Sequence, residues 1–245
     1  MSNLLGNALD SVRRGAINVA RRALPQRCEL CAGTSGSDIL CRGCARSLPR
    51  LGPACPVCAL PNPGGEVCGQ CIAEPPPFEA TVAAFVYAFP VDRLMHAFKY
   101  HGRLALAEWG AHAIGAARGR WSGSLPQRLI AVPLARERQR ERGYNQAFEI
   151  ARVLAREWRI PLIRGAVQRR RASPPQAALP LEERARNVRG AFSCDLELAG
   201  LTVAVVDDVM TTGASLAELA KTLKRAGAIR VENWVVARTL PPGAA

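Results

Sequence analysis

The sequence predicts an α/β fold: a mostly parallel sheet with helices on both faces, preceded by a small cysteine-rich module. Three observations support this. Val203–Val206 is a continuous apolar run rich in β-branched residues, as expected for a strand buried on both faces of a parallel sheet. Runs with strand and helix periodicity alternate between residues 79 and 237. Eight cysteines in regularly spaced pairs come before residue 75. The length of 245 residues allows one large domain and a small module.

The expected elements of the large domain follow in order. A strand is expected over residues 79–89, a short helix around Leu94–Phe98, and a second helix over residues 104–117. A short strand over residues 129–132 is followed by a polar segment that contains Arg136, Arg138, Arg140 and Arg142, and then by a helix that ends near Trp158. Further strands are expected over residues 190–198 and 229–237. The arginine segment is either an Arg-rich loop that forms a second anion-binding place or the solvated edge of a helix, in which Glu137 and Glu141 interleave with the arginines.

Chemistry-bearing residues cluster directly after the run at Val203–Val206. The carboxylates Asp207 and Asp208 come first, and the loop that follows consists of Thr211, Thr212, Gly213, Ala214 and Ser215. Ligands of open α/β sheets bind outside the carboxyl ends of strands. A short loop at a helix N-terminus presents backbone N–H groups to phosphate. Paired carboxylates suit ribose hydroxyls, Mg²⁺, or both, so the stretch predicts a site for a phosphorylated sugar. The alternative is that these residues only cap a strand–turn–helix junction.

The cysteines predict metal binding. They form four Cys-x-x-Cys pairs, and each of the first four lies 27 residues before its counterpart in the second four. With no secretory signal expected, this pattern favours two structural Cys₄ zinc sites over disulfides, and iron–sulfur is the weaker option. Sequential ligation is the simpler assignment, and a cross-braced arrangement stays open. The ligands are Cys28, Cys31, Cys41 and Cys44 for one ion, and Cys55, Cys58, Cys68 and Cys71 for the other.

Positive charge is concentrated in one part of the chain. The net charge is +13, and residues 118–189, with 17 Arg and 6 Glu, carry +11 of it. Such a segment attracts polyanions such as a pyrophosphorylated sugar or a nucleic-acid backbone, although a solvated basic surface is the alternative. The sequence contains no long charge-free apolar run and no apolar signal region. We therefore expect a cytoplasmic protein without a transmembrane segment.

Two further segments have open interpretations. Residues 1–24 have the apolar spacing of an amphipathic helix, which would dock on the protein, meet a partner, or lie on a membrane surface; internal docking is favoured. Residues 165–192 include a long Pro-rich, basic stretch that is either a lid over a ligand or a linker. The expected domains are residues 1–24, a double zinc module over residues 25–77, and an α/β domain over residues 78–242.

Two resemblances rest on these residues. The stretch Val203–Ser215 resembles the diphosphoribosyl-binding motif of type I phosphoribosyltransferases. About residues 28–240 are similar to the ComF family of competence proteins. That similarity is carried by the cysteine module, Phe98–Tyr100, Gly102-Arg103, Val132–Leu134, Arg142–Gln146, the Asp-Asp motif and Ala237–Leu240. The long loop adds further matching positions, namely Arg171, Gln176, Leu179, Arg184, Asn187, Ala191 and Phe192.

The resemblance implies a type I phosphoribosyltransferase-like fold and a site for phosphoribosyl pyrophosphate with Mg²⁺. Asp207 and Asp208 would contact the ribose hydroxyls, and the loop from Thr211 to Ser215 would hold the 5-phosphate. Pro133, Leu134 and Arg136 would belong to the pyrophosphate loop, with Lys99 and Arg142 as additional anion contacts. Arg171, Gln176, Arg184 and Asn187 would lie on a flexible loop.

Several functions remain open at this level. The favoured one is a protein of natural competence that binds phosphoribosyl pyrophosphate and acts in the uptake of single-stranded DNA. The alternative is an active phosphoribosyltransferase of nucleotide metabolism or salvage with no DNA role. The acceptor of such a transfer stays open, since the sequence shows no obvious pocket for a base. A third reading makes the zinc module a docking surface for a competence helicase or another uptake protein.

Overall fold

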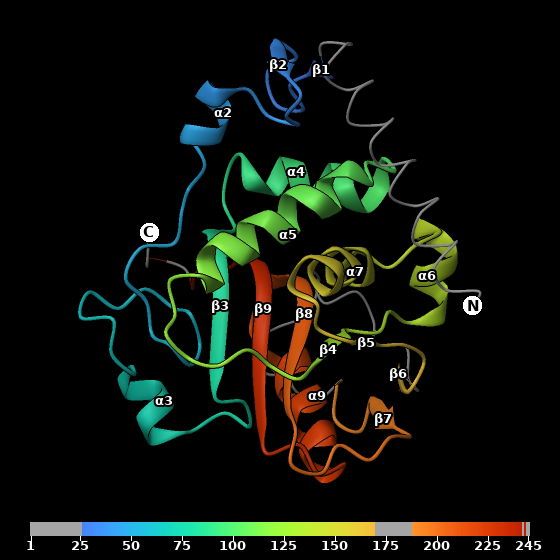
Figure 1. Ribbon diagram of the computed structural model, residues 1–245. Coiled ribbons are helices and arrows are strands. Elements are labelled where there is room, and N and C mark those ends of the chain that lie inside the picture. Colours follow the sequence, from blue (N-terminus) through green and yellow to red (C-terminus); the bar gives the residue numbers. More distant parts are fainter. Residues whose placement is uncertain (1–25, 170–187, 242, 244–245) are drawn as a thin grey trace. The chain divides into compact units, whose positions relative to one another are not determined.

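The computed structural model describes residues 26–169, 188–241 and 243 (Figure 1). It divides into two compact units, Met1–Leu48 and Pro49–Ala245, so the two cysteine quartets fall in different units. The described part of the first unit contains the strands β1 (Gln26–Arg27) and β2 (Thr34–Gly36), which pair antiparallel, and the short helix α2 (Arg42–Arg46). Its buried apolar residues are few, namely Cys28, Leu40 and Leu48. Such a small core makes metal binding the expected source of its stability.

The second unit is built on a five-stranded sheet in the order β3-β9-β8-β4-β5, and every neighbouring pair is parallel. Its strands are β3 (Ala80–Val86), β4 (Arg128–Ala131), β5 (Leu162–Ile163), β8 (Thr202–Met210) and β9 (Arg230–Arg238). A separate antiparallel pair joins β6 (Val167–Arg169) and β7 (Phe192–Cys194). The helices are α3 (Gly69–Ala73), α4 (Val91–Tyr100), α5 (Ala105–Arg118), α6 (Arg136–Arg142), α7 (Gln146–Trp158) and α9 (Ala214–Arg225).

Helices cover both faces of the sheet (Figure 1). Helix α5 packs on β3 and β9, and α7 packs on β8 and β4. At Gly110 of α5, an added Cβ would lie 3.0 Å from a methyl group of Val236, so this helix approaches the sheet closely. The opposite face buries Val203, Val205 and Val235 against the leucines of α9. The alternation along β8 and β9 therefore supplies an apolar face to each helix layer, which confirms the predicted fold class.

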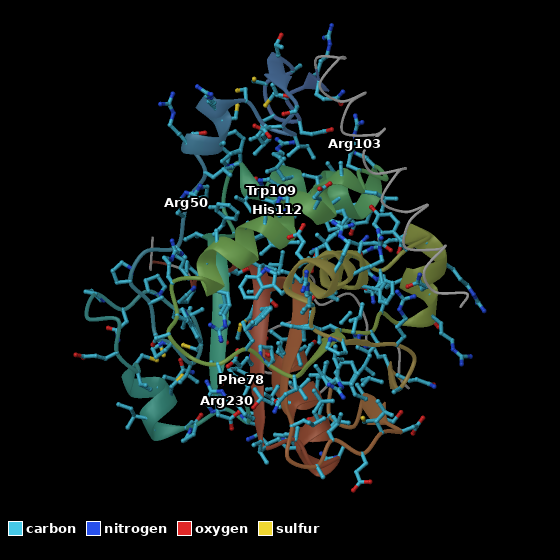
Figure 2. The ribbon with its side chains drawn as sticks, in the orientation of Figure 1. Arg50, Phe78, Arg103, Trp109, His112 and Arg230 are labelled. Carbon is cyan, nitrogen blue, oxygen red and sulfur yellow. The ribbon has the colours of Figure 1, made fainter. Side chains whose placement is uncertain are left out.

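Aromatic and cationic contacts are made at β3, the strand at one edge of the sheet. Trp109 of α5 stacks on Phe85 of β3, with ring centroids 5.3 Å apart and an interplanar angle of 3°. The Arg50 guanidinium lies 5.7 Å from the centroid of the same ring, and Figure 2 labels Arg50 and Trp109. These contacts fix the segment after Leu48 to β3.

Two elements differ from the sequence-based expectation. The segment after β4 was expected to be an arginine-rich loop, but Arg136–Arg142 forms the helix α6. None of its residues is buried, so it has no apolar stripe that periodicity can detect. Of the expected strand over residues 190–198, the structure shows the shorter β7, which pairs with the described residues of β6. The expected helix over residues 1–24 lies outside the described residues.

Candidate functional site

The two carboxylates lie within β8 instead of following it, because β9 continues alongside as far as the pair Met210–Arg238. The backbone N–H of Asp208 donates to Asp207 Oδ1 over 2.9 Å, and that of Val209 donates to Asp208 Oδ1 over 2.8 Å. Asp208 is buried and Asp207 is half-buried. Both side chains are therefore held at the carboxyl end of a central strand, where ligands of such sheets bind.

Lys99, near the end of α4, reaches this carboxylate pair. Its Nζ lies 2.8 Å from Asp208 Oδ2, and the two side chains are 21% and 12% exposed. Burial disfavours both charges, but the contact outweighs it: the pKa of Lys99 is raised and that of Asp208 is lowered from its ordinary value. The structure thus brings together Lys99 and Asp208, which are predicted site residues far apart in the sequence.

The pKa of Asp207 is shifted in the opposite direction to that of Asp208. Burial first, and then the neighbouring Asp208 carboxylate, raise the pKa of Asp207 well above its ordinary value, and Lys99 only partly offsets them. A carboxyl pair with such divergent pKa values is common at functional sites. A bound cation would favour the ionised form of Asp207, so this side chain is suited to gain charge when a ligand arrives.

The predicted Thr211–Ser215 loop follows β8, and its last two residues, Ala214 and Ser215, form the start of α9. Gly213 has φ of +83° and is the N-cap residue of α9. An added Cβ there would lie 2.6 Å from Met210 Cε, so both conformation and space favour glycine. The Ala214 N–H is oriented toward Thr212 Oγ1, 3.3 Å away. A helix N-terminus preceded by a left-handed glycine is a common geometry for binding phosphate.

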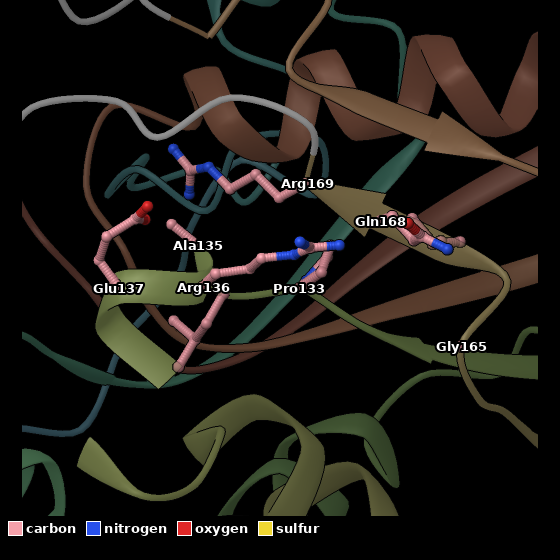
Figure 3. A pocket seen from close by; sticks show the side chains of 9 residues that line it. Pro133, Ala135, Arg136, Glu137, Gly165, Gln168 and Arg169 are labelled. Atoms are coloured by element: carbon pink, nitrogen blue, oxygen red, sulfur yellow. The ribbon is translucent and has the colours of Figure 1, made fainter. Parts of the chain in front are cut away.

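A pocket of about 660 Å³ opens beside β4 and β6 (Figure 3). The predicted residues Pro133, Leu134 and Arg136 line it from one side, and Gln168 and Arg169 of β6 line it from the other. Burial lowers the pKa of the Arg169 guanidinium, and the negative charge of Asp207 opposes that effect. The pocket is therefore lined by two guanidinium groups, those of Arg136 and Arg169, a composition suited to a pyrophosphate. Arg169 was not predicted from the sequence, since it stands within a run of three arginines.

The residues after α6 hold this region together. Gly143, with φ of +75°, ends α6, and the Tyr144 hydroxyl donates to the backbone carbonyl of Phe98. Asn145 caps α7 by accepting from the Phe148 N–H over 3.2 Å, while its Nδ2 donates to the Val132 carbonyl over 2.9 Å. These side chains tie the end of β4 and the end of α4 to α7.

The predicted anion contact Arg142 lies next to this anchor. Its guanidinium carbon is 5.1 Å from the ring centroid of Tyr100, and its Nη1 donates to Gln146 Oε1 over 3.2 Å. Tyr100 follows Lys99 in α4, so Arg142 lies on the α4 side of the site. The predicted flexible-loop residues Arg171, Gln176, Arg184 and Asn187 lie outside the described residues.

Each cysteine quartet has the geometry of one metal site. Within each quartet, the four Sγ atoms all lie within 4.8 Å of one another. Cys31 and Cys41 Sγ are 3.8 Å apart, and Cys58 and Cys68 Sγ are 3.7 Å apart. A tetrahedral site with Zn–S bonds of about 2.3 Å requires sulfur separations of about 3.8 Å. The quartets therefore fit zinc, and the grouping is the sequential one.

The second quartet is fastened to the sheet by hydrogen bonds. Thr81 of β3 donates from its backbone N–H to the Pro56 carbonyl and from its hydroxyl to the Val57 carbonyl, over 2.9 and 2.6 Å. Arg238, the last residue of β9, donates from Nε to the Cys58 carbonyl over 2.9 Å. Sequence reasoning could not assign these roles, because a single Thr or Arg in a strand gives no sign of its partner.

Comparison with known proteins supports the zinc module and identifies the family. Residues 19–72 match the double zinc ribbon domain. The "DNA utilization protein YhgH" of Salmonella typhimurium is 35% identical over 206 residues, which cover 82% of this chain and 91% of that protein. "Competence protein F" of Haemophilus influenzae is 32% identical over 227 residues, covering 86% of this chain and 96% of that one. The chain belongs to the ComF family.

Other matches are more distant. "Competence protein ComFC" of Bacillus subtilis is 26% identical over 215 residues, covering 82% of this chain and 84% of that protein. Among solved structures, a purine phosphoribosyltransferase from Pyrococcus horikoshii matches with a TM-score of 0.31 at 18% identity, covering 64% of this chain and 77% of that one. A TM-score this low carries no argument about the site. The double zinc ribbon match and the sulfur geometry together support two Cys₄ zinc sites.

The described residues also bear on the membrane. None of the helices in the ranges 26–169 and 188–241 combines the length and the apolar character that a membrane span requires.

Proposed function

We propose that this ComF-family protein binds phosphoribosyl pyrophosphate with Mg²⁺ at the carboxyl edge of the sheet. One observation carries the proposal: the half-buried Asp207 and the buried Asp208 at the end of β8 lead directly into a glycine-containing loop at the N-terminus of α9. In this assignment Asp207 and Asp208 contact the ribose hydroxyls. The backbone N–H groups of Thr211–Ser215 hold the 5-phosphate. Three side chains face the pyrophosphate, namely Arg136, Arg169 and Lys99.

The charges of the site support this ligand class. Lys99 and Asp208 already form an ion pair, and Asp207 has a raised pKa, so the site holds less negative charge than two free carboxylates would. A Mg²⁺ ion bound with the pyrophosphate would favour the ionised form of Asp207. The arginines of the pocket would accept the phosphate oxygens through charge-assisted hydrogen bonds.

Isothermal titration calorimetry of the zinc-loaded full chain with phosphoribosyl pyrophosphate and Mg²⁺ tests the proposal. We expect saturable heat for the wild type and none for the Asp207→Asn/Asp208→Asn double variant. Asp195→Asn is the matched control, since Asp195 is an exposed carboxylate outside the site, in the turn after β7. Absence of heat in the wild type, or equal affinity in the double variant, overturns the assignment.

We further propose a role in natural competence and the uptake of single-stranded DNA, within the cytoplasm. Relatives bear the names DNA utilization protein and competence protein F, and residues 118–189 carry a net charge of +11. Binding of a fluorescent oligonucleotide should weaken steeply with salt, with a log–log slope that reports the number of neutralised phosphates. Neutralising Arg136 and Arg140 together should make that slope less steep. Binding that is independent of salt argues against the DNA role.

A further inference from the structure

Arg238 is a buried cation that touches two parts of the protein with different tasks. Arg238 is 5% exposed and is the last residue of β9. Its Nε donates to the carbonyl of Cys58, a ligand of the second zinc site. Its Nη1 donates to the carbonyl of Met210 over 3.2 Å and to the carbonyl of Thr211.

The two contacts are made by different nitrogens of one planar guanidinium group. Because this group is rigid, a movement of the Cys58 carbonyl also reorients the Nη1 atom that donates to the Thr211 carbonyl. The Thr239 backbone strengthens the second contact: its carbonyl accepts from Arg238 Nη1 over 2.8 Å, and its N–H donates to the Met210 carbonyl over 2.9 Å. The start of the Thr211–Ser215 loop is therefore fixed by the same side chain that fixes the zinc ligand Cys58.

Thr81 provides a comparison within the same unit. It also holds the second quartet, through the Val57 carbonyl, and its hydroxyl accepts from Asn233 Nδ2 over 3.2 Å. The hydrogen bonds described for the Thr81 hydroxyl are with Val57 and Asn233, not with the loop. Thr81 therefore only anchors the second quartet, whereas Arg238 both anchors it and contacts the loop.

We propose that Arg238 is a positioning residue that couples zinc at Cys55, Cys58, Cys68 and Cys71 to the order of the Thr211–Ser215 loop. Zinc holds the Cys58 backbone in place, Arg238 transmits that position, and the loop keeps its N–H groups oriented for an anion. The first quartet belongs to the other compact unit and serves as the comparison. The effect on ligand affinity rests on the proposed function, whereas the effect on loop order does not.

Hydrogen exchange of the loop amides, measured without any ligand, is the primary test. Cys68→Ser removes a ligand from the second quartet, and Cys41→Ser removes the equivalent ligand, 27 residues earlier, from the first. We expect amides of the loop to exchange about fivefold faster in Cys68→Ser, as for loss of one hydrogen bond, and to be unchanged in Cys41→Ser. Metal analysis must show one zinc ion in each variant. Equal exchange of the loop in the two variants overturns the proposal.

A double-mutant cycle assigns the coupling to Arg238. Lysine keeps the charge but carries its donors on one nitrogen, so it lacks the separate Nε and Nη1 donors that reach the carbonyls of Cys58 and Thr211. Arg238→Lys should speed loop exchange by itself, and adding Cys68→Ser should then have little further effect. Additive effects of the two changes overturn the role of Arg238.

Arg118→Lys controls for loss of a buried guanidinium. Arg118 is 2% exposed, and its Nη2 donates to the carbonyls of Gly123 and Ser124 instead of those of Cys58 and Thr211. Its replacement should leave loop exchange unchanged. Thr81→Val should loosen the second quartet and release its zinc faster to a chelator, with the zinc-saturated loop unaffected. A loop that responds equally to Arg118→Lys and Arg238→Lys reports general destabilisation and contradicts the proposal.

Ligand binding gives a separate readout. If phosphoribosyl pyrophosphate with Mg²⁺ binds, it should slow zinc release from the second quartet about fivefold or more, because coupling is reciprocal. Release from the first quartet should not change. Binding without this protection overturns the coupling and leaves the proposed function intact. If the wild-type protein does not bind phosphoribosyl pyrophosphate, the proposed function is overturned. The hydrogen-exchange experiment still decides whether zinc and the loop are coupled.

Discussion

The Lys99–Asp208 ion pair gives the sharpest prediction about stability. In Lys99→Met, the carboxylate of Asp208 keeps its burial but loses the ammonium group 2.8 Å away. Breaking a fully buried pair costs about 3–5 kcal/mol, since the remaining charge is uncompensated. Lys99 is one-fifth exposed, and Asp208 can escape part of the cost by taking up a proton. We therefore expect a loss of about 2–3 kcal/mol in the free energy of unfolding at pH 7.

Urea denaturation of the zinc-saturated protein, followed by tryptophan fluorescence, measures this loss between pH 4 and pH 7. In the wild type the pKa of Asp208 is lowered, so its contribution is present above the ordinary pKa of aspartate and is lost as the pH falls. In Lys99→Met, burial still raises the pKa of Asp208, and the Val209 N–H opposes it without the help of Lys99, so the deficit of the variant grows as the pH rises. The deficit should be largest at pH 7 and shrink toward pH 4.

The Lys99→Met/Asp208→Asn double variant is the control, because it removes both charges. It should recover a large part of the stability lost by the single variant. A deficit of less than about 0.5 kcal/mol at pH 7 would place the pair in the class of solvated surface bridges. A deficit that does not change with pH would show that the lost stability comes from packing and not from the charge of Asp208.

Three further changes have defined outcomes. Asp207→Asn should raise the free energy of unfolding at pH 7, because the raised pKa of Asp207 means that its ionised form is disfavoured in the folded protein. The extra stability of the variant should vanish as the pH falls, since the wild-type carboxyl then takes up a proton. Gly213→Ala should cost about 1–2 kcal/mol in thermal or urea denaturation, because φ is +83° there, and should weaken phosphate binding. Removing zinc with a chelator should abolish hydrogen-exchange protection in residues 26–48, whose described core is small, while β8 and β9 stay protected. Persistent protection of residues 26–48 without metal would contradict that account.

Patterns with a strong local signal predicted their elements well. The apolar run Val203–Val206 is buried in β8, and residues 79–89 contain β3. The cysteine repeat indicated the grouping of ligands, because eight residues at fixed spacing carry far more information than one. Helix α6 escaped detection, since Arg136–Arg142 has no buried side and its helical state leaves no apolar period.

Features that depend on distant partners were out of reach of the sequence. The extension of β8 past Val206 depends on the parallel course of β9, which pairs Asp207 with Val235. Lys99 was expected to contact an anion, but its pairing with Asp208 needs the packing of α4 beside the strand end. Arg169 and Arg238 looked like ordinary members of a basic chain. Only the fold shows that the Arg169 guanidinium is influenced by the charge of Asp207, and that Arg238 is buried with carbonyl groups as its partners.

A crystal structure of the zinc-loaded protein grown with phosphoribosyl pyrophosphate and Mg²⁺ tests the central claim most directly. We predict the 5-phosphate on the N–H groups of Thr211–Ser215, the ribose hydroxyls against Asp207 and Asp208, and the pyrophosphate in the pocket between Arg136 and Arg169. Density for the ligand elsewhere on the protein, or a loop without bound phosphate at saturating ligand, would contradict it.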